Sequence, residues 1–505
     1  MFNQGRAGVG FIKISLHKTT KIANDMKSSL IKYIVAGLGG IILASCTSIR
    51  SITDSIQRKD RSPQVEKIAI SDSVVSHCIA TGQIPYLKFK ALEKGSFSFS
   101  KAGLLYSLDG GETWIALGAN ASTPVIGIGD SVIWKNNSEM TPASSEEIGT
   151  FSSTGRFDAS GNIMSLYFGD DCKTKADLTG KDYAFSALFS FCTGLVNAEA
   201  LELPATALAD YCYSGMFEDC INLKTAPELP AMMLSNGCYS SMFKGCVSLA
   251  SVPELPAISV ANGCYNSMFE GCKSLTDAPA LPATTLAKSC YSSMFEGCTG
   301  LSSAPVLPAT MLARNCYSGM FYGCTSLTAA PELPATVLED YCYSSMFGNC
   351  TGLKTAPKLP ATKLAESCYS GMFNNCTSLI DAPDLPAMIL TTGCYEYMFY
   401  GCTGLTTAPV LPARILAVSC YTSMFMNCSN LNSIKAAFIT PPSITYTNMW
   451  VFKVNPSGNF YKAGDAKWKV KGVNAIPSGW GVIKLPRNAV FKNILVKENS
   501  HGRKK

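Results

Sequence analysis

Histidine is scarce in this sequence, with three copies among 505 residues. His17, His77 and His501 all lie near the two ends of the chain. A Cys–His or Ser–His pair therefore cannot readily assemble on a folded body between them. We expect no catalytic residues, no cofactor and no enzymatic activity.

Charged residues are also few. Asp, Glu, Lys and Arg make up 15% of the chain and hydrophobic residues 47%, which argues against a disordered protein and predicts a large buried core. The net charge of +6 is modest, and part of it lies in a predicted basic tail, residues 487–505. We therefore do not expect nucleic acid as a partner.

The apolar run near the start of the chain is too short to span a bilayer by the usual count of about 20 residues. Residues 27–46 read KSSLIKYIVAGLGGIILASC, which predicts a secretory signal whose ending resembles a bacterial lipobox. Cleavage before Cys46 would leave that cysteine to carry a lipid, and an ordinary cleaved signal is the alternative. Residues 1–45 are thus interpreted as an over-extended start plus the signal peptide, and the polar residues 46–84 as a tether.

The sequence contains nine copies of one repeat. CYSGMFEDCINLKTAPELPA at Cys212 returns as CYSSMFEGCTGLSSAPVLPA at Cys290, with a period of 26 residues that predicts a solenoid. Counting the first cysteine as column 1, all nine copies carry Tyr in column 2, Met in 5, Phe in 6, Cys in 9 and Leu in 12. These columns should fill equivalent positions in successive coils. The first cysteines are Cys212, Cys238, Cys264, Cys290, Cys316, Cys342, Cys368, Cys394 and Cys420.

Each coil is predicted to contain one short helix and one short strand. Leu286, Cys290 and Met294 form one apolar stripe of such a helix, and column 8 holds Gly, Asn or Asp, as a helix C-cap does. A parallel strand is expected around residues 301–304, before prolines that cannot donate ladder hydrogen bonds. The predicted fold class is therefore an α/β solenoid.

The solenoid is predicted to cover residues 180–433. Residues 180–210 are interpreted as a worn first coil, because terminal coils of a solenoid are usually atypical. The 26-residue period does not continue into residues 434–486, which contain three tryptophans and turn-rich segments. This change indicates a C-terminal β cap.

The order of short helix, Phe-x-x-Cys-x-x-Leu, brief strand and proline resembles the leucine-rich repeats of BspA-like surface lipoproteins of Bacteroidales type. Phe295, Cys298 and Leu301, with their equivalents, carry the resemblance, which covers roughly half of the chain. The extra first cysteine and the second proline depart from the usual pattern. The resemblance implies leucine-rich-repeat-like coils and a binding or adhesion protein whose partner is a host or bacterial surface protein or glycan.

Residues 85–170 alternate apolar and polar residues between Gly, Asp and Asn turns, which predicts a small all-β sandwich ahead of the solenoid. This stretch contains one Asp-box, the structural hairpin motif of sialidase propellers, formed by Ser107, Asp109, Gly111, Thr113 and Trp114. One copy cannot build a propeller. We interpret it as a tight hairpin pinned by Asp109 and plugged by Trp114.

Columns 1 and 9 hold eighteen of the 22 cysteines. Exported proteins commonly form disulfides, and coils stacked about 4.8 Å apart would bring column neighbours within bonding range. Nine members cannot all pair along one column, however, so buried free thiols are favoured over disulfides. A metal site is not expected, because the cysteines lie eight residues apart and lack a neighbouring histidine.

Column 17 varies from copy to copy, which is typical of a display surface. Its uncharged members include Ala280, Val306 and Val410. The alternative interpretations of this column are a solvated strand edge and the carboxylates of a hydrolase. The charged members of the column, our candidate partner-binding residues, are Glu228, Glu254, Glu332, Lys358 and Asp384.

Two functional hypotheses follow. In the first, a membrane-bound, surface-exposed outer-membrane lipoprotein uses columns 7, 10, 13, 14 and 17 of its solenoid to contact a partner. In the second, Trp114 and Trp134 of the sandwich bind glycan in a lipoprotein associated with carbohydrate processing. Residues 47–49 lack the acidic cluster that resembles a surface-export signal, so location on the periplasmic face is an alternative.

Overall fold

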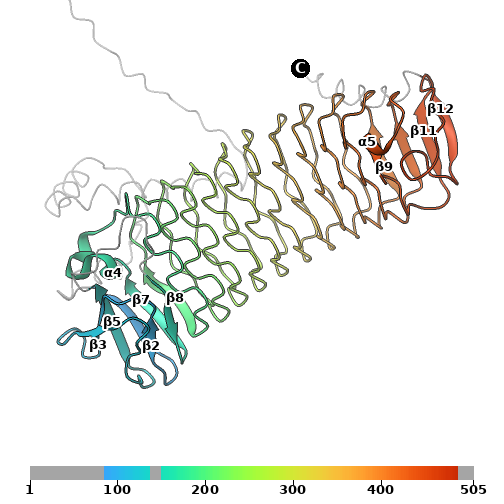
Figure 1. The fold of residues 1–505 in the computed structure, drawn as a ribbon. Helices are drawn as coiled ribbons and strands as arrows, with labels where there is room; N and C mark the ends of the chain where they lie inside the picture. Colours follow the sequence, from blue (N-terminus) through green and yellow to red (C-terminus); the bar gives the residue numbers. More distant parts are fainter. Residues whose placement is uncertain (1–84, 137–148, 487–505) are drawn as a thin grey trace, which may run out of the picture. The chain divides into compact units, whose positions relative to one another are not determined.

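The computed structural model describes residues 85–136 and 149–486. They belong to one compact unit, in which a β-sheet region is followed by stacked coils and a parallel sheet (Figure 1). The predicted signal peptide with Cys46, the tether and the basic tail lie outside the described residues. Within the described ranges, no helix is long and apolar enough to cross a membrane.

Seven strands precede the solenoid and confirm the predicted all-β region. Together with β8 (Leu195–Glu202) of the first coil, they form a six-stranded sheet of order β4-β3-β5-β1-β7-β8 and a two-stranded sheet of β2 and β6. The pattern LKFKA in β1 alternates buried and exposed residues, as expected of a strand with one face on the core. The strands are β1 (Leu87–Ala91), β2 (Phe97–Phe99), β3 (Leu104–Ser107), β4 (Ile115–Leu117), β5 (Ser131–Asn136), β6 (Phe151–Ser153) and β7 (Phe157–Asn162).

An aromatic cluster fills the space between these two sheets. The ring of Phe89 in β1 lies 5.2 Å from that of Phe97 in β2 and 4.9 Å from that of Phe151 in β6, measured between centroids. Trp134 in β5 lies 5.0 Å from Phe151. Aromatic pairs at such distances add to the free energy gained from area burial, so the two sheets are held face to face as in a sandwich.

The β-sheet region and the solenoid share one sheet and one core. After α4 (Ser165–Phe168) and the 3₁₀-helix η1 (Gly169–Thr174), β8 (Leu195–Glu202) of the first coil pairs in parallel with β7. Phe189 of the same coil stacks on Phe151, with ring centroids 5.7 Å apart. The β-sheet region therefore covers the N-terminal end of the stack.

The solenoid is confirmed, but the helix expected in each coil is wrong. Around Cys290, residues 288–297 form successive turns. The N–H groups of Ser292, Met294 and Glu296 each donate to the carbonyl three residues earlier. Those of Tyr291 and Ser293 donate across to the carbonyls of Cys316 and Ser318 in the next coil.

This alternation explains the small residues in the repeat. Ser289, Ser293 and Gly297 have φ of 54°, 53° and 70°, so every fourth residue is left-handed. Column 8 is left-handed as expected, yet it is one of three such positions rather than the cap of a helix. An α-helix would bond all these N–H groups within the coil. Here half of them join neighbouring coils instead.

The expected strand is also shorter than predicted in most coils. Parallel pairing occurs near the predicted place, in column 14, but as isolated bridges such as Thr355 to Asp381. A second row of bridges, which the sequence analysis did not predict, joins column 22, as between Val337 and Lys363. The prolines of columns 16 and 19 lie between the two rows and limit the pairing.

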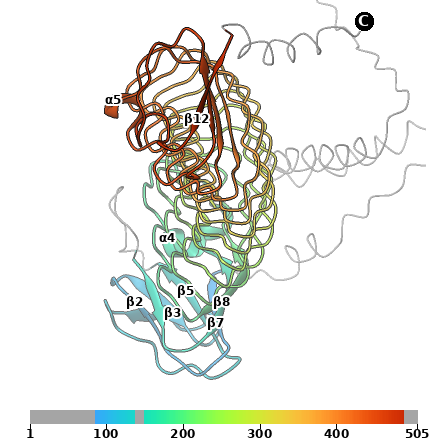
Figure 2. The ribbon, with the colours of Figure 1, turned by 90° about the vertical axis from the view of Figure 1, so that its right-hand side faces the viewer.

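Side-chain ladders fill the inside of the stack. The Tyr, Met, Phe, Cys and Leu columns are buried in all nine coils. Phe243 and Phe269 stack with ring centroids 5.6 Å apart and planes 3° apart, and Tyr239 and Tyr265 at 5.9 Å and 7°. Figure 2, viewed along the stack, shows the coils lying behind one another. Identical residues thus pack against identical residues from coil to coil.

A four-stranded parallel sheet ends the stack. Its order is β12-β11-β10-β9, and Trp450 covers the last ladder rings, with centroids 6.2 Å from Tyr421 and 6.0 Å from Phe425. The buried ammonium of Lys462 donates to the carbonyls of Ala466 and Trp468. The elements are β9 (Thr407–Leu411), β10 (Ser433–Ala436), α5 (Ile444–Thr447), β11 (Asn459–Ala463) and β12 (Gly481–Leu485).

Candidate binding surface

The repeat cysteines belong to the core and offer no reactive site. All twenty cysteines of the described ranges are free and buried. Each column 9 thiol donates to the carbonyl of the column 6 phenylalanine one coil earlier, as Cys298 Sγ does to Phe269 at 3.0 Å. Burial raises the pKa of Cys298 to about 12. The thiolate that nucleophilic attack or metal binding requires is therefore disfavoured near neutral pH.

Column 17 is held out from the stack in the first seven coils. Glu228, Glu254, Glu332, Lys358 and Asp384 are exposed, and the leucines that follow them in column 18 are buried. The intervening copies Ala280 and Val306 are exposed as well. Flanking prolines restrict the backbone on both sides, so the column forms a stiff outward row.

This row ends before the C-terminal sheet. Val410 is half-buried in β9, and its equivalent in the next coil, Ala436, is buried in β10. The row therefore presents seven side chains of changing charge and size, two of them uncharged. It brings together the residues expected to bind a partner, which lie far apart in the sequence.

The Asp-box folds into the predicted hairpin between β3 and β4. Ser107 Oγ donates to Asp109 Oδ1 at 2.7 Å, and the N–H of Thr113 donates to the same carboxylate at 3.0 Å. These hydrogen bonds, first of all those from Thr113, lower the pKa of Asp109. Trp114 is half-buried against the ring of Tyr86, and Lys135 Nζ lies 4.3 Å from a Trp114 ring centroid.

Trp134 does not have the exposure expected of a binding residue. Its side chain is fully buried in the aromatic cluster between the sheets, because β5 directs alternate residues inward. It cannot contact a partner from this position, which corrects the sequence-based expectation. Only Trp114 of the two candidate tryptophans has accessible surface.

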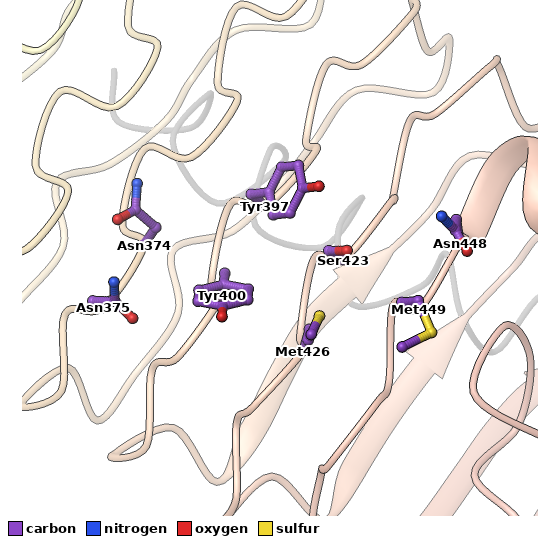
Figure 3. A pocket seen from close by; sticks show the side chains of 8 residues that line it. All are labelled: Asn374, Asn375, Tyr397, Tyr400, Ser423, Met426, Asn448 and Met449. Carbon is purple, nitrogen blue, oxygen red and sulfur yellow. The ribbon is translucent and has the colours of Figure 1, made fainter.

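A groove of about 520 Å³ lies on the turn face, where columns 4 and 7 point outward (Figure 3). It crosses four successive coils near the C-terminal end of the stack. Its aromatic and apolar lining consists of Tyr397, Tyr400, Met426 and Met449, and its polar lining of Asn374, Asn375, Ser423 and Asn448.

Column 7 was among the contact columns predicted from the sequence, but column 4 was not. That column is Gly or Ser in the coils from Gly215 to Gly371, then becomes Tyr397. Met449 occupies the equivalent place two coils later, and both have positive φ, 54° and 53°. The bulky Tyr397, which interrupts a run of Gly and Ser in column 4, was the sequence signal that could have identified this column.

The charge of the turn face changes along the stack. In the early coils column 7 holds charged residues, and Lys244 pairs with Glu270 at 3.2 Å. Burial raises the pKa of Glu218 in the same column. From Tyr322 onward the column is uncharged through Met426. The groove therefore lies where column 7 is uncharged.

Residues 85–136 and 149–486 contain few side chains suited to metal binding or acid–base catalysis. These ranges hold no group of three His, Cys, Asp or Glu side chains placed to bind a metal. All three histidines lie outside them.

Comparison with known proteins identifies the repeat. A family profile described as a BspA type leucine-rich repeat region matches in six copies, over residues 182–328 and 314–457. No curated protein matches the chain. The two matched ranges together span more than half of the 505 residues. The chain belongs to the BspA-type leucine-rich-repeat family.

Proposed function

We propose that this protein is a lipid-anchored binding or adhesion protein of the cell envelope, which uses its solenoid to contact a macromolecular partner. The observation that supports this most is the contrast between the core and column 17. Six columns stay identical and buried in nine coils, while column 17 is exposed in the first seven coils and varies in residue type among them. A rigid scaffold with a varied outward row is the usual design of a solenoid binding surface.

The function that we propose involves no catalysis. BspA-type repeats are suggestive of interaction or adhesion, and the buried thiols lack the electropositive, partly exposed surroundings of reactive cysteines. Surface proteins or glycans of a host or of another bacterium remain the proposed partners. Hydrolysis of any glycan by the pure protein in a broad substrate screen would contradict the non-catalytic part.

Binding through column 17 can be tested with grouped substitutions. We expect the triple variant Glu228→Ala, Glu254→Ala, Glu332→Ala to lose attachment of protein-coated beads to immobilised fibronectin, collagen or epithelial cells. The variant Lys88→Ala, Lys90→Ala, on the exposed face of β1 and outside the predicted contact columns, serves as the control. Attachment that is unchanged by the column 17 substitutions, or lost equally in the control, would refute the assignment.

Lipid anchoring and location need separate tests, because Cys46 lies outside the described residues. We expect Cys46→Ala to abolish incorporation of labelled palmitate and to release the protein from the membrane fraction. Protease treatment of intact cells should cleave the repeats while a periplasmic control protein survives. Protection of the repeats would instead favour the periplasmic face.

Glycan binding by the β-sheet region, in a lipoprotein associated with carbohydrate processing, is the second candidate. Trp114 is the one residue that favours it, since its half-buried ring lies beside Tyr86 and Lys135. If Trp114→Ala removes partner binding and the column 17 variant does not, this candidate replaces the first.

A further inference from the structure

We propose that the groove crossing Asn374 to Met449 binds an uncharged oligosaccharide. It is separate from the column 17 row and from the hairpin of Trp114, so it does not depend on the function proposed above. Its chemistry, its length and its hydrogen bonding each point to this class of ligand.

The lining chemistry is that of sugar recognition. Tyr397 is 43% exposed, and its ring centroid lies 6.1 Å from that of Tyr400 with the planes 62° apart. The two rings thus offer differently oriented apolar faces, which suit the C–H faces of sugar rings. Amide and hydroxyl groups of Asn374, Asn375 and Ser423 surround them (Figure 3). Pockets that fix orientation with few polar groups among aromatic ones are typical small-ligand sites.

The amides are held in place by the coils. Asn374 Nδ2 donates to the carbonyl of Gly371 at 2.8 Å, and Asn375 Nδ2 donates to Asn349 Oδ1 at 2.9 Å. Each bond uses one amide hydrogen and fixes the orientation of the amide group. Pre-oriented polar groups reduce the entropy lost on binding.

No lining side chain is charged at neutral pH. The eight residues are asparagine, serine, tyrosine and methionine, in contrast to Lys244 and Glu270 on the same face of earlier coils. A phosphate, a uronic acid or a charged peptide would find no counter-ion among them. The ligand is therefore expected to be neutral.

The length of the groove suits a chain of sugars. Its lining residues come from four coils, and successive core rings there, Phe373, Phe399, Phe425 and Trp450, lie 5.7–6.0 Å apart. Three such steps exceed a single sugar ring. An oligosaccharide lying along the stack can contact Asn375 at one end and Asn448 at the other.

An extended peptide fits less well, because the backbone is already paired. The N–H groups of Asn375, Tyr397 and Ser423 donate to carbonyls of the next coil. Those of Asn374, Tyr400 and Met426 donate within their own coils. A peptide that binds by strand addition needs a free edge, and these groups do not provide one.

Column 4 supplies an independent argument. Tyr397 and Met449 adopt a left-handed conformation that disfavours large side chains, where the coils from Gly215 to Gly371 use Gly or Ser. Both large residues line this one groove. Bulky residues such as Tyr211 and Tyr341 are left-handed in another column, but within column 4 the large residues of the described coils occur where they line the groove, which favours a function for their side chains.

The test is calorimetric titration of the full-length protein with cellohexaose, mannohexaose and xylohexaose, with hexagalacturonate as the charged probe and gelatin as the peptide probe. We expect at least one neutral hexasaccharide to bind. Tyr397→Gly and Tyr400→Ala should each weaken that binding at least tenfold. Tyr322→Ala, a column 7 tyrosine outside the groove, and the triple column 17 variant should change it less than twofold.

Hydroxyl-radical footprinting of the unmodified protein provides a second measurement that needs no variant to fold. The bound hexasaccharide should protect Tyr397, Tyr400 and Met426 and leave Tyr322 unprotected. The proposal is overturned if no neutral hexasaccharide binds, if only gelatin or hexagalacturonate binds, or if protection falls on Trp114 or column 17 instead. Loss of bead attachment in the column 17 variant with saccharide binding intact would separate the two proposals.

Discussion

At the scale of single residues, the left-handed positions decide the path of each coil. Ser293 in column 4 has φ of 53°, and the same column holds Gly319 and Gly371 with φ of 64° and 62°. Serine tolerates this conformation at some cost, while a β-branched side chain is strongly disfavoured there. The small residues common in columns 4 and 8 are therefore favoured by the backbone as much as by packing.

Substitutions of Ser293 test this requirement. We expect Ser293→Val to lower the free energy of unfolding by about 1–2 kcal/mol, because valine resists the left-handed conformation. Ser293→Gly should stay within about 0.5 kcal/mol of the original protein, since relief of strain offsets the added freedom of the unfolded chain. Urea denaturation followed by circular dichroism measures both. Equal effects of the two changes would contradict the backbone argument.

The thiols offer a second residue-scale prediction. Burial raises the pKa of Cys238 and Cys316 to about 12, so their reaction with a thiol reagent at pH 8 should be very slow in the folded protein. In guanidinium without reductant, all twenty described cysteines should react. Ellman's reagent and mass spectrometry count them. A smaller count after unfolding would show that disulfides exist, the alternative that the sequence left open.

At the scale of the element, the turn run shows why the helix prediction failed. Cys290, Tyr291, Met294 and Phe295 are all buried, so the inward positions recur every four residues. A helix repeats every 3.6 residues. Over one short segment the two periods are hard to separate, and the deciding hydrogen bonds run to the next coil, which local patterns do not contain.

The Asp-box hairpin is an element whose stability should depend on pH. The pKa of Asp109 is lowered in the folded state, so its contribution is present above the unfolded-state pKa of about 4 and is lost as the pH falls through the lower folded value. We expect Asp109→Asn to lower the melting temperature at pH 7 and to have a shrinking effect at pH 4 and below. Thermal scans over this range measure it, with Glu112→Gln in the same loop as the control. A pH-independent difference would argue against the carboxylate's role.

At the scale of the whole molecule, stability comes from contacts between neighbouring coils. The ladders continue from Phe189 through nine coils to Trp450, with the β-sheet region at one end and the parallel sheet at the other. In such a stack each coil mainly stabilises its neighbours. The ends matter most, because an uncovered ladder would expose aromatic rings to water.

Deletion of a whole coil tests this arrangement. Removal of residues 290–315 joins equivalent positions, so the shortened protein should still unfold cooperatively, with a slightly lower midpoint. Removal of residues 290–302 should prevent folding, because it shifts the inward columns out of register. Circular dichroism and size-exclusion chromatography compare the two variants. Similar behaviour of both deletions would rule out a coil-by-coil stack.

The period, the inward columns and the outward column 17 could be predicted from the residues alone, because a repeat with fixed columns must place equivalent residues in equivalent surroundings. The Asp-box hairpin was also predictable, since its hydrogen bonds join residues four apart or closer. Tertiary structure alone decided what depends on the neighbouring coil or sheet. Cross-coil bonding replaced the helix with turns, sheet packing buried Trp134, and the stacking of four coils brought Asn374, Tyr397, Ser423 and Met449 together into one groove.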